Sequence, residues 1–557
     1  MFIKNIKSIL KLSEINRVDG IIVAFYSLIL SILDLFSIGF LALVVTRIFF
    51  VENQDVELSI FKSTLNLSSI NLVILLFFSV ILKFVATFFV NKVIFKISNE
   101  KQHLLRLKIF KLFSKVDFLK FQEKSPNIYI AVVGNHIKTF GSAFSTTILF
   151  FGEILFFLFL LAVLLFVNFK VTLFLMIFFI IFFFIYSKVK ILNPKQVGFE
   201  TKEAYKSLYD FVINFFGSFK EIKIYNKFET INSNLKNYSD KIFSSDLKNN
   251  LLSILPRLLI EFIIVIFFTI LLFFTLKFNL NIFSNLEYFS ILLASVIRIL
   301  PFFIQILRYQ NNLRYSDTFI QEINENINFL TNFQVEDKKI DNQFQTGIKK
   351  ITFKNITYSY GEKKIINNSE FNIEIDKFTS ITGESGSGKT TLLNIVCGFI
   401  KTNIHNIYIN DKLLNKDVSI SNLIAYVPQD KFVFEGEVWK NISLEYNKNN
   451  CDLLKIEEVL NLARLKIDKD FVLYSNGQNL SGGQKQRLII ARALYFSKKI
   501  IILDESTNEL DQENEEQILN DIKKIKGVAV IIVSHKKSAI RLCDKRYNLI
   551  NKKLILQ

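Results

Sequence analysis

A glycine-rich segment carries the clearest chemistry in the sequence. Residues Gly383–Thr390 fit the pattern G-x-x-x-x-G-K-[ST], and the surrounding FTSITGESGSGKTTLLNIVCGF reads as strand, loop and helix. Glycines in such a loop let backbone N–H groups turn toward phosphates, and the N-terminus of the following helix favours anions. We therefore expect Lys389 to reach the β- and γ-phosphates of a nucleotide and the hydroxyl of Thr390 to bind Mg²⁺.

Two further apolar runs end in residues that suit phosphate chemistry. KKIIILDES reads as a buried parallel strand that ends at Asp504 and Glu505, and VAVIIVSHK reads as another that ends at His535. Ligands bind at the carboxyl edge of such sheets. The pattern predicts Asp504 as the Mg²⁺-binding acid and Glu505 as the base that orients the attacking water.

Between these motifs lies LSGGQ, residues 480–484, and the whole set in this order resembles the ATP-binding cassette (ABC) superfamily. The resemblance implies ATP and Mg²⁺ as cofactors. It implies catalytic roles for Glu505, for His535 as the switch histidine and for Gln429 of YVPQD. It also implies metal binding by Thr390, Gln429 and Asp504. The nucleotide-binding residues that it implies are Tyr360, Gly383, Ser385, Gly386, Gly388, Lys389, Thr390, Thr391, Ser481, Gly483, Gln484 and Asp511.

The same resemblance implies a partner. In this superfamily two cassettes close head-to-tail, so that Ser481 and Gly483 would bind the γ-phosphate of a nucleotide held by the opposite chain. The phosphate-loop lysine, Glu505 and LSGGQ are all intact here, which favours a homodimer with two working sites.

The first half of the chain has a different composition. The chain has 557 residues, 51% of them hydrophobic, with 61 phenylalanines and a formal charge of +18. A disordered chain has too little apolar surface to match this composition. Six apolar stretches are long enough to span a membrane; we place them near 19–48, 69–96, 143–168, 171–193, 257–277 and 287–309.

Charge in the connecting segments gives the orientation. Segment 97–140 carries eight lysines and arginines and segment 188–257 carries twelve, whereas Lys62, Lys170 and Lys277 are the single basic residues of three other loops. The positive-inside rule places the two basic segments and both termini in the cytoplasm. The positive charge is thereby explained by topology, and we expect no nucleic-acid partner.

These observations predict the architecture. The expected fold is an α-helical transmembrane domain, with six spans and long cytoplasmic helical extensions, fused to an α/β P-loop cassette. The expected domains are residues 1–325 with the coupling helices, a polar linker at 326–345 and the cassette at 346–557. We expect a multi-pass protein of a bacterial inner membrane. Segments 116–131 and 208–229 resemble coupling helices, and VELSIFKSTLNL after the first span is expected to form a short external helix.

Basic residues within the predicted spans point toward a cargo. Lys83, Arg257 and Arg298 lie in spans two, five and six, where charged groups are costly and are by default functional. Together they could line a cavity for an anion such as a pyrophosphate, which arginine grips with two hydrogen bonds. A structural reading stays open, because Arg257 could pair with Glu261 and Lys83 with Asp34 or Glu153.

The membrane half also has a family resemblance. SILDLFSIG, FFGEILFF followed by NFKVTLFL, LPRLLIEF, RILP and GSFKEIKI resemble bacterial polysaccharide-type flippases, above all the lipid-linked oligosaccharide flippase of bacterial protein N-glycosylation. This implies ATP-driven movement of a polyprenyl-pyrophosphate glycan, with Lys83, Arg257 and Arg298 at its pyrophosphate. The alternatives are an exporter of lipid, peptide or drug and, from another class, an ATP-gated channel or regulator.

Cysteine and histidine offer no competing site. Cys397, Cys451 and Cys543 lie far apart and show no CxxC or CxxH spacing. Neither a zinc site nor a disulfide framework is expected, and the segment that holds these thiols is expected in a reducing compartment.

Overall fold

The fold is described from a computed structural model. It describes residues 2–14, 56–60, 63–67, 69–167, 192–278, 286–335, 338–339, 347–400, 406–414, 418–496, 498–507 and 509–557, together with scattered residues between 19 and 44 and residues 169, 173 and 176. The chain divides into two units, one of residues 1–116 and 121–334 and the other of residues 117–120 and 335–557. Each is described by itself.

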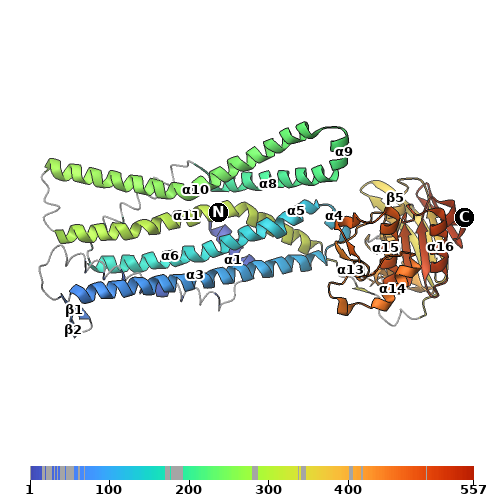
Figure 1. Ribbon diagram of the computed structural model, residues 1–557, viewed down its shortest axis with the longest axis horizontal. Coiled ribbons are helices and arrows are strands. Elements are labelled where there is room, and N and C mark those ends of the chain that lie inside the picture. The colour runs from blue at the N-terminus through green and yellow to red at the C-terminus, as the bar shows by residue number, and fades with distance from the viewer. Residues whose placement is uncertain are drawn as a thin grey trace. The chain divides into compact units, whose positions relative to one another are not determined.

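The N-terminal unit consists of long helices that lie side by side, with α6 packed against both α3 and α11 (Figure 1). Helices α8 and α10 pack on each other, and the short α9 lies at the turn between them. The helices are α1 (Phe2–Ser13), α3 (Ser69–Phe113), α5 (Pro126–Ala131), α6 (Ile137–Val167), α8 (Pro194–Gly217), α9 (Phe219–Ile224), α10 (Phe228–Phe278) and α11 (Leu286–Asn332), with a π-helical turn η1 (Val132–His136) between α5 and α6. The short α4 (Phe118–Gln122) is divided between the two units.

Composition explains why these helices are suited to a membrane. Three of the described helices are long and apolar enough to cross one, within Ile70–Phe113, Pro126–Ala162 and Phe228–Ile266. On α3 the large side chains of Phe77 and Phe84 are 63% and 74% exposed. Such surface is unfavourable in water and favourable in lipid. The predicted first and fourth spans lie mostly outside the described residues.

Outside the apolar stretches, the helices are held together by a buried core and by ion pairs. A core of α1, α3, α6 and α11 buries Ile9, Ile109, Phe140 and Leu313. Around it, Lys195 pairs with Asp317 at 2.8 Å and Lys248 with Glu200 at 2.7 Å. Charged pairs thus join α8 to α11 and to α10 beyond the apolar stretches.

The segment after the first predicted span has a different secondary structure from the one predicted. Where a short helix was expected, β1 (Val56–Ile60) and β2 (Ser63–Leu67) form an antiparallel hairpin. The expectation was wrong because VELSI and STLNL alternate apolar and polar residues with a period of two, which is the strand period and not the helix period.

Among its described residues, the C-terminal unit contains two main sheets and two two-stranded sheets, β11-β12 and β3-β9. The larger has the order β10-β13-β14-β6-β15-β16, in which only β16 runs antiparallel. The smaller, β5-β4-β7-β8, is antiparallel. The strands are β3 (Lys338–Lys339), β4 (Lys350–Tyr360), β5 (Lys363–Glu374), β6 (Phe378–Thr382), β7 (Asn406–Ile409), β8 (Lys412–Leu413), β9 (Val418–Ser419), β10 (Ile424–Val427), β11 (Gly436–Glu437), β12 (Val472–Leu473), β13 (Ile500–Asp504), β14 (Ala529–Val533), β15 (Lys545–Ile550) and β16 (Lys553–Leu556).

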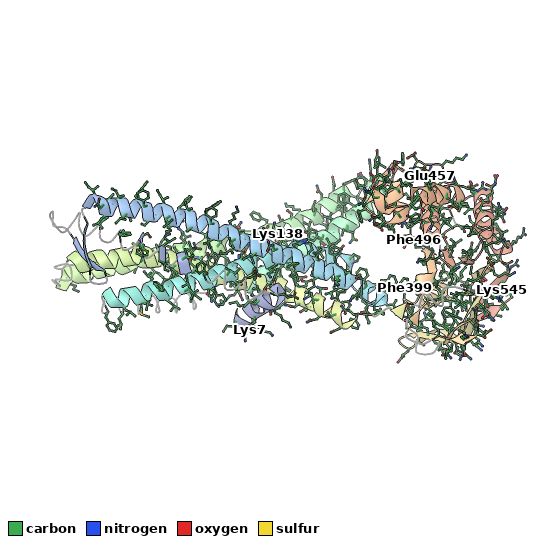
Figure 2. The ribbon with its side chains drawn as sticks, turned by 90° about the horizontal axis from the view of Figure 1, so that it is seen from below. Lys7, Lys138, Phe399, Glu457, Phe496 and Lys545 are labelled. Atoms are coloured by element: carbon green, nitrogen blue, oxygen red, sulfur yellow. The ribbon has the colours of Figure 1, made fainter. Side chains whose placement is uncertain are left out.

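Helices cover these sheets and divide the apolar interior into two cores. One core packs around Trp439, Leu488 and Ile518, and the other around Phe353, Leu392 and Ile531. Residues 117–120 group with this unit, where the ring of Phe118 stacks on that of Phe399, labelled in Figure 2, at a centroid distance of 4.6 Å. The helices are α12 (Lys389–Val396), α13 (Val438–Ser443), α14 (Leu453–Leu462), α15 (Gly482–Tyr495), α16 (Gln512–Lys523) and α17 (Lys537–Arg541).

Candidate nucleotide site

Sheet order brings the predicted residues to one edge. Strands β10, β13, β14 and β6 are parallel neighbours, so their carboxyl ends share one side of the sheet. Gln429 lies just beyond β10, Glu505 follows β13, His535 lies just beyond β14 and the phosphate loop follows β6. Four segments that are far apart in sequence therefore meet at the edge where open α/β sheets bind ligands.

The phosphate loop connects β6 to α12 through glycines with left-handed backbone. Gly383, Gly386 and Gly388 have φ of +150°, +76° and +110°, and Gly388 is the N-cap of α12. The Nζ atom of Lys389 donates hydrogen bonds to the carbonyl oxygens of Gly383, at 2.8 Å, and Glu384, at 3.0 Å. The lysine ammonium thus lies over the loop, next to the backbone groups that would face a phosphate.

A cavity of about 690 Å³ opens over this loop. Its lining includes Gly383–Ser387 of the loop together with Lys364 and His535. Tyr360, predicted to stack on adenine, is not among the lining residues. It lies 47% exposed at the end of β4, with its ring edge-on to Tyr358.

The three predicted catalytic side chains come together. Gln429 Nε2 donates to Glu505 Oε2 at 3.0 Å, and His535 Nε2 lies 4.0 Å from Glu505 Oε1. Glu505 has a φ of +48°, unusual for a residue with a side chain, and its amide donates to the carbonyl of Val533 at 2.9 Å. A non-glycine residue in this conformation costs free energy and tends to occur at functional sites.

Asp504 lies deeper, with 5% of its surface exposed. Its Oδ2 accepts a hydrogen bond from the hydroxyl of Tyr426 at 2.7 Å. Burial raises the pKa of this carboxyl, while the Tyr426 hydrogen bond and the charge of Lys389 act in the opposite direction. A buried acid beside the phosphate-loop lysine has the chemistry of a Mg²⁺ ligand, and Thr390 at the start of α12 offers a hydroxyl.

The signature segment belongs to a different part of the unit. Ser481 is the N-cap of α15 and forms a capping box with Gln484, whose backbone amide donates to Ser481 Oγ. Helix α15 packs in the core around Leu488, whereas α12 packs in the core around Leu392. Among the described residues, no hydrogen bond joins 480–484 to the phosphate loop.

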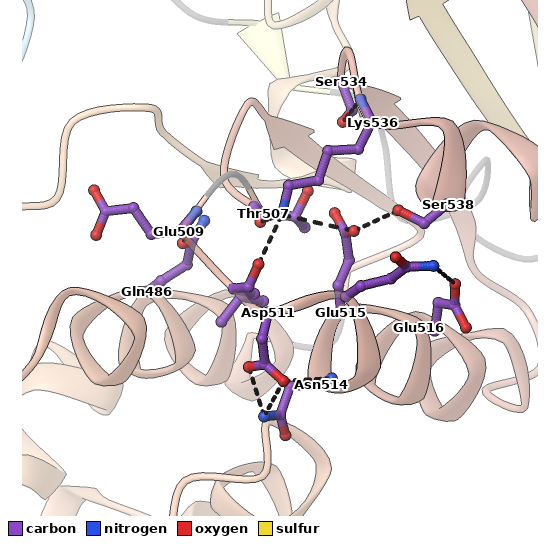
Figure 3. Close-up of polar contacts among 12 residues, drawn as sticks. Gln486, Thr507, Glu509, Asp511, Asn514, Glu515, Glu516, Ser534, Lys536 and Ser538 are labelled. Atoms are coloured by element: carbon purple, nitrogen blue, oxygen red, sulfur yellow. Dashed lines mark hydrogen bonds and ion pairs between the residues drawn. The ribbon is translucent and has the colours of Figure 1, made fainter.

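Two residues beside the site escaped the sequence analysis. Tyr426, which binds Asp504, gives a weak signal as a strand tyrosine three residues before Gln429. Lys536, next to His535, donates to the carbonyls of Thr507 at 2.9 Å and Leu510 at 2.7 Å and lies 3.8 Å from Glu515 (Figure 3). It links the segment after β14 to the loop that contains Asp511, whose carboxylate caps α16 through Asn514.

Comparison with known proteins agrees with this geometry. Residues 366–508 match the family model described as ABC transporter. The C-terminal unit is an ABC cassette. The fold of the chain resembles the solved structure of a bacterial Atm1-family ABC exporter with ATP bound, with a TM-score of 0.75 and 16% sequence identity over 97% of this chain and 95% of that one.

Curated relatives match over a shorter length. A Rickettsia bellii protein described as an export ATP-binding/permease protein is 36% identical over 205 residues, 35% of this chain and 36% of the relative. The microcin-J25 export ATP-binding/permease protein McjD of Escherichia coli is 34% identical over 207 residues, 36% of each chain. The chain thus covers about a third of the length of these relatives. Their similarity supports the assignment of the cassette and gives no information on what this chain transports.

The structure describes the side chains of only some of the basic residues within the predicted spans. Arg257 Nε bonds Glu261 Oε1 at 2.7 Å on α10, as the structural alternative allowed, and the Arg257 side chain is 67% exposed. Lys83 lies on α3, and its side chain is not free of interactions. The side chain of Arg298 and residue Asp34 lie outside the described residues.

Proposed function

We propose that this protein is an ATP-driven exporter in which the cassette hydrolyses ATP and the helical unit carries the cargo across a bacterial inner membrane. One observation carries the proposal: Gln429 and His535 flank Glu505 at the sheet edge beside the phosphate loop. Phosphoryl transfer to water needs charge stabilisation and a positioned nucleophile. Lys389 and Mg²⁺ held by Asp504 and Thr390 would supply the former, and Glu505 would orient the water.

The working form proposed is a homodimer. If LSGGQ binds the γ-phosphate, this segment must face the phosphate loop across the nucleotide. Within one chain Ser481 caps a helix of the other core. A second copy would supply its Ser481 and Gly483 to complete each site, and the intact motifs support two equivalent sites.

The cargo proposed is a lipid-linked anionic glycan, moved from the cytoplasmic to the outer leaflet. Its support is the flippase resemblance together with the exposed guanidinium of Arg257 just after Pro256 on α10. An arginine bound to one carboxylate on one edge keeps further N–H groups to offer a pyrophosphate. Arg298 and Lys83 would complete the contact, while both termini stay cytoplasmic.

The test is ATPase activity of the full chain in liposomes, with and without polyprenyl-pyrophosphate oligosaccharide. Glu505→Gln should lower hydrolysis about a hundredfold or more while ATP still binds, since the base is removed and the phosphate loop is intact. Glu516→Gln, a half-buried acid on α16 that accepts a hydrogen bond from Gln512, is the matched control and should hydrolyse ATP normally. Normal hydrolysis by Glu505→Gln would overturn the proposed site.

The cargo is tested by three variants in the same liposomes. We expect the lipid to stimulate the wild-type enzyme, and the stimulation to be lost in Arg257→Ala and Arg298→Ala. Glu261→Gln separates the two roles of Arg257. If Arg257 serves the cargo, Glu261→Gln keeps the stimulation; if it serves only the ion pair, Glu261→Gln behaves like Arg257→Ala and the glycan proposal fails.

A further inference from the structure

A second cavity lies wholly within the helical unit. It has a volume of about 350 Å³ and is lined by α5, η1, α6, α8 and α11, at residues 128–139, 201–209 and 315–322. All of these residues lie outside the predicted spans, and those at 128–139 and 201–209 lie on the two basic segments. The cavity shares no residue with the nucleotide site and is large enough for a small organic ligand.

Aromatic side chains line this cavity, and the backbone on one side of it forms an unusual helical turn. The rings of Tyr205, Tyr209, Tyr315 and Phe319 line the cavity. On one side the helix is wound as a π-turn over Val132–His136, which interrupts the α-helix between α5 and α6. Single π-turns are rare and recur at functional sites. This turn ends at a histidine of the cavity wall.

That histidine, His136, is 5% exposed, and its Nδ1 has no hydrogen-bond partner among the described residues. Its ring packs edge-on against Phe319 at 5.3 Å. Buried polar atoms nearly always have a partner, and an unpaired one costs about 1–3 kcal/mol. A polar side chain kept buried and unpaired in a cavity wall indicates a site that is built for a ligand.

The charges on the cavity wall are mainly positive. Lys202 pairs with Glu322 at 2.9 Å, so these two charges cancel. Lys138, labelled in Figure 2, and Lys206 are exposed lining residues that form no ion pair with any described residue. Two free ammonium groups at an aromatic cavity favour an anion over a cation or a neutral molecule.

One hydroxyl is also available. Asn135 Nδ2 donates to the Tyr209 oxygen at 2.7 Å, so the proton of that hydroxyl remains free to donate. The Tyr205 hydroxyl differs, because it lies 3.2 Å from Asp246 Oδ2 and donates there. A negatively charged oxygen at Lys138, Lys206 and Tyr209 would receive three donors from two different elements, α6 and α8.

We infer that this cavity binds a small organic acid, with its apolar or aromatic body between the tyrosine rings and its carboxylate or phosphate at Lys138, Lys206 and Tyr209. Such a ligand would contact α6, α8 and α11 together. The inference is independent of ATP-driven transport, because it concerns binding to the helical unit alone.

The test uses the purified full chain in detergent and the probe 4-(trifluoromethyl)benzoate, followed by ¹⁹F line broadening. ATP and Mg²⁺ are kept saturating, so that the nucleotide site contributes nothing. We expect Lys138→Gln/Lys206→Gln to weaken probe binding at least about fivefold, since two charge-assisted contacts are lost. Lys111→Gln/Lys236→Gln, exposed lysines on α3 and α10, is the matched control and should bind normally.

Three further readouts complete the test. The neutral 4-(trifluoromethyl)benzyl alcohol should bind more weakly than the acid, and hydrogen exchange should slow in peptides 131–139 and 202–209 when the acid is added. Equal binding of acid and alcohol, or equal loss in both lysine pairs, would overturn the inference. Stronger competition by dihexanoyl phosphatidylglycerol than by unlabelled benzoate would overturn it too, by assigning the site to a lipid headgroup.

Discussion

The hydroxyl of Tyr426 lies 2.7 Å from Oδ2 of Asp504, so that the predicted magnesium ligand is held by a neighbouring strand. The two residues come from β10 and β13, which pair in parallel. Burial raises the pKa of Asp504, and the Tyr426 hydrogen bond opposes that rise. The tyrosine therefore helps to keep a buried acid in the ionised form that binds Mg²⁺.

Replacing this tyrosine should shift the pH dependence of hydrolysis. In Tyr426→Phe the pKa of Asp504 rises further, because the bond that favours its charged form is gone. Protonated Asp504 cannot bind the metal, so activity is lost at a higher pH than in the wild type. We expect the acid limb of the ATPase profile to move upward, and the Mg²⁺ concentration for half-maximal rate at pH 6 to rise about three- to tenfold.

The matched control is Tyr408→Phe, a half-buried strand tyrosine whose ring faces Lys354. Its profile should coincide with that of the wild type. If Tyr426→Phe also left the acid limb and the Mg²⁺ requirement unchanged, the hydrogen bond would have no role in metal binding.

Lys536 should stabilise the loop after Glu505. Its ammonium lies 3.8 Å from Glu515, which is fully buried, and donates to two loop carbonyls. In Lys536→Met, Ser538 is the one side chain among the described residues that still donates a hydrogen bond to the buried carboxylate, at 2.7 Å. We expect a loss of about 1–3 kcal/mol in stability, because an uncompensated buried charge is costly and Lys536 itself is partly exposed.

Thermal unfolding of the purified chain measures this effect. Lys537→Met, one residue along and exposed, is the control and should unfold like the wild type. Adding Glu515→Gln to Lys536→Met should recover part of the loss, since the unpaired charge is removed with its partner. The single variant Glu515→Gln is measured as well. If the losses of Lys536→Met and Glu515→Gln simply add in the double variant, the two residues are not coupled.

Much of the nucleotide site could be predicted from local sequence. Gly383–Thr390 needs only a strand before it and a helix after it, and both are present as β6 and α12. The isoleucine run before Asp504 is a fully buried parallel strand, as its composition predicted. These patterns are short-range, so a single sequence contains them whole.

The unpredicted parts depend on which strands are neighbours. Tyr426 meets Asp504 only because β10 lies beside β13, although 78 positions separate the two residues in the chain. Parallel strands joined by long crossovers leave no local signal of their order. In the same way, the cavity at His136 is lined by α5, η1, α6, α8 and α11, and no spacing within one helix reveals it.

The phosphate-loop glycines should differ in what they tolerate. A Cβ at Gly383 would lie 2.8 Å from Ser387 Oγ and 2.9 Å from the carbonyl oxygen of Leu549, which is backbone and cannot move aside. A Cβ at Gly386 would meet nothing within 4 Å. We expect Gly383→Ala to lower the unfolding temperature clearly more than Gly386→Ala, which bears only the left-handed strain of about 1–2 kcal/mol. Equal losses in the two variants would contradict this account.

The three thiols should react at very different rates. Burial raises the pKa of Cys397 to about 12 and that of Cys543 to about 11. Their side chains are also closed to solvent, with 4% and 7% of their surface exposed. Cys451 is half-buried, and its Sγ lies 3.2 Å from the hydroxyl of Ser443.

Since the thiolate is the reactive form, a raised pKa and a closed environment together slow alkylation. At pH 7.5 we expect N-ethylmaleimide to add one group per native chain, at Cys451, and three groups after denaturation. Mass spectrometry of the intact chain counts the adducts and peptide mapping locates them. Cys451→Ser should remove the native adduct and leave two in the denatured chain. Fast labelling of Cys397 in the native protein would mean that the helix after the phosphate loop opens to solvent, contrary to the packed core around Leu392.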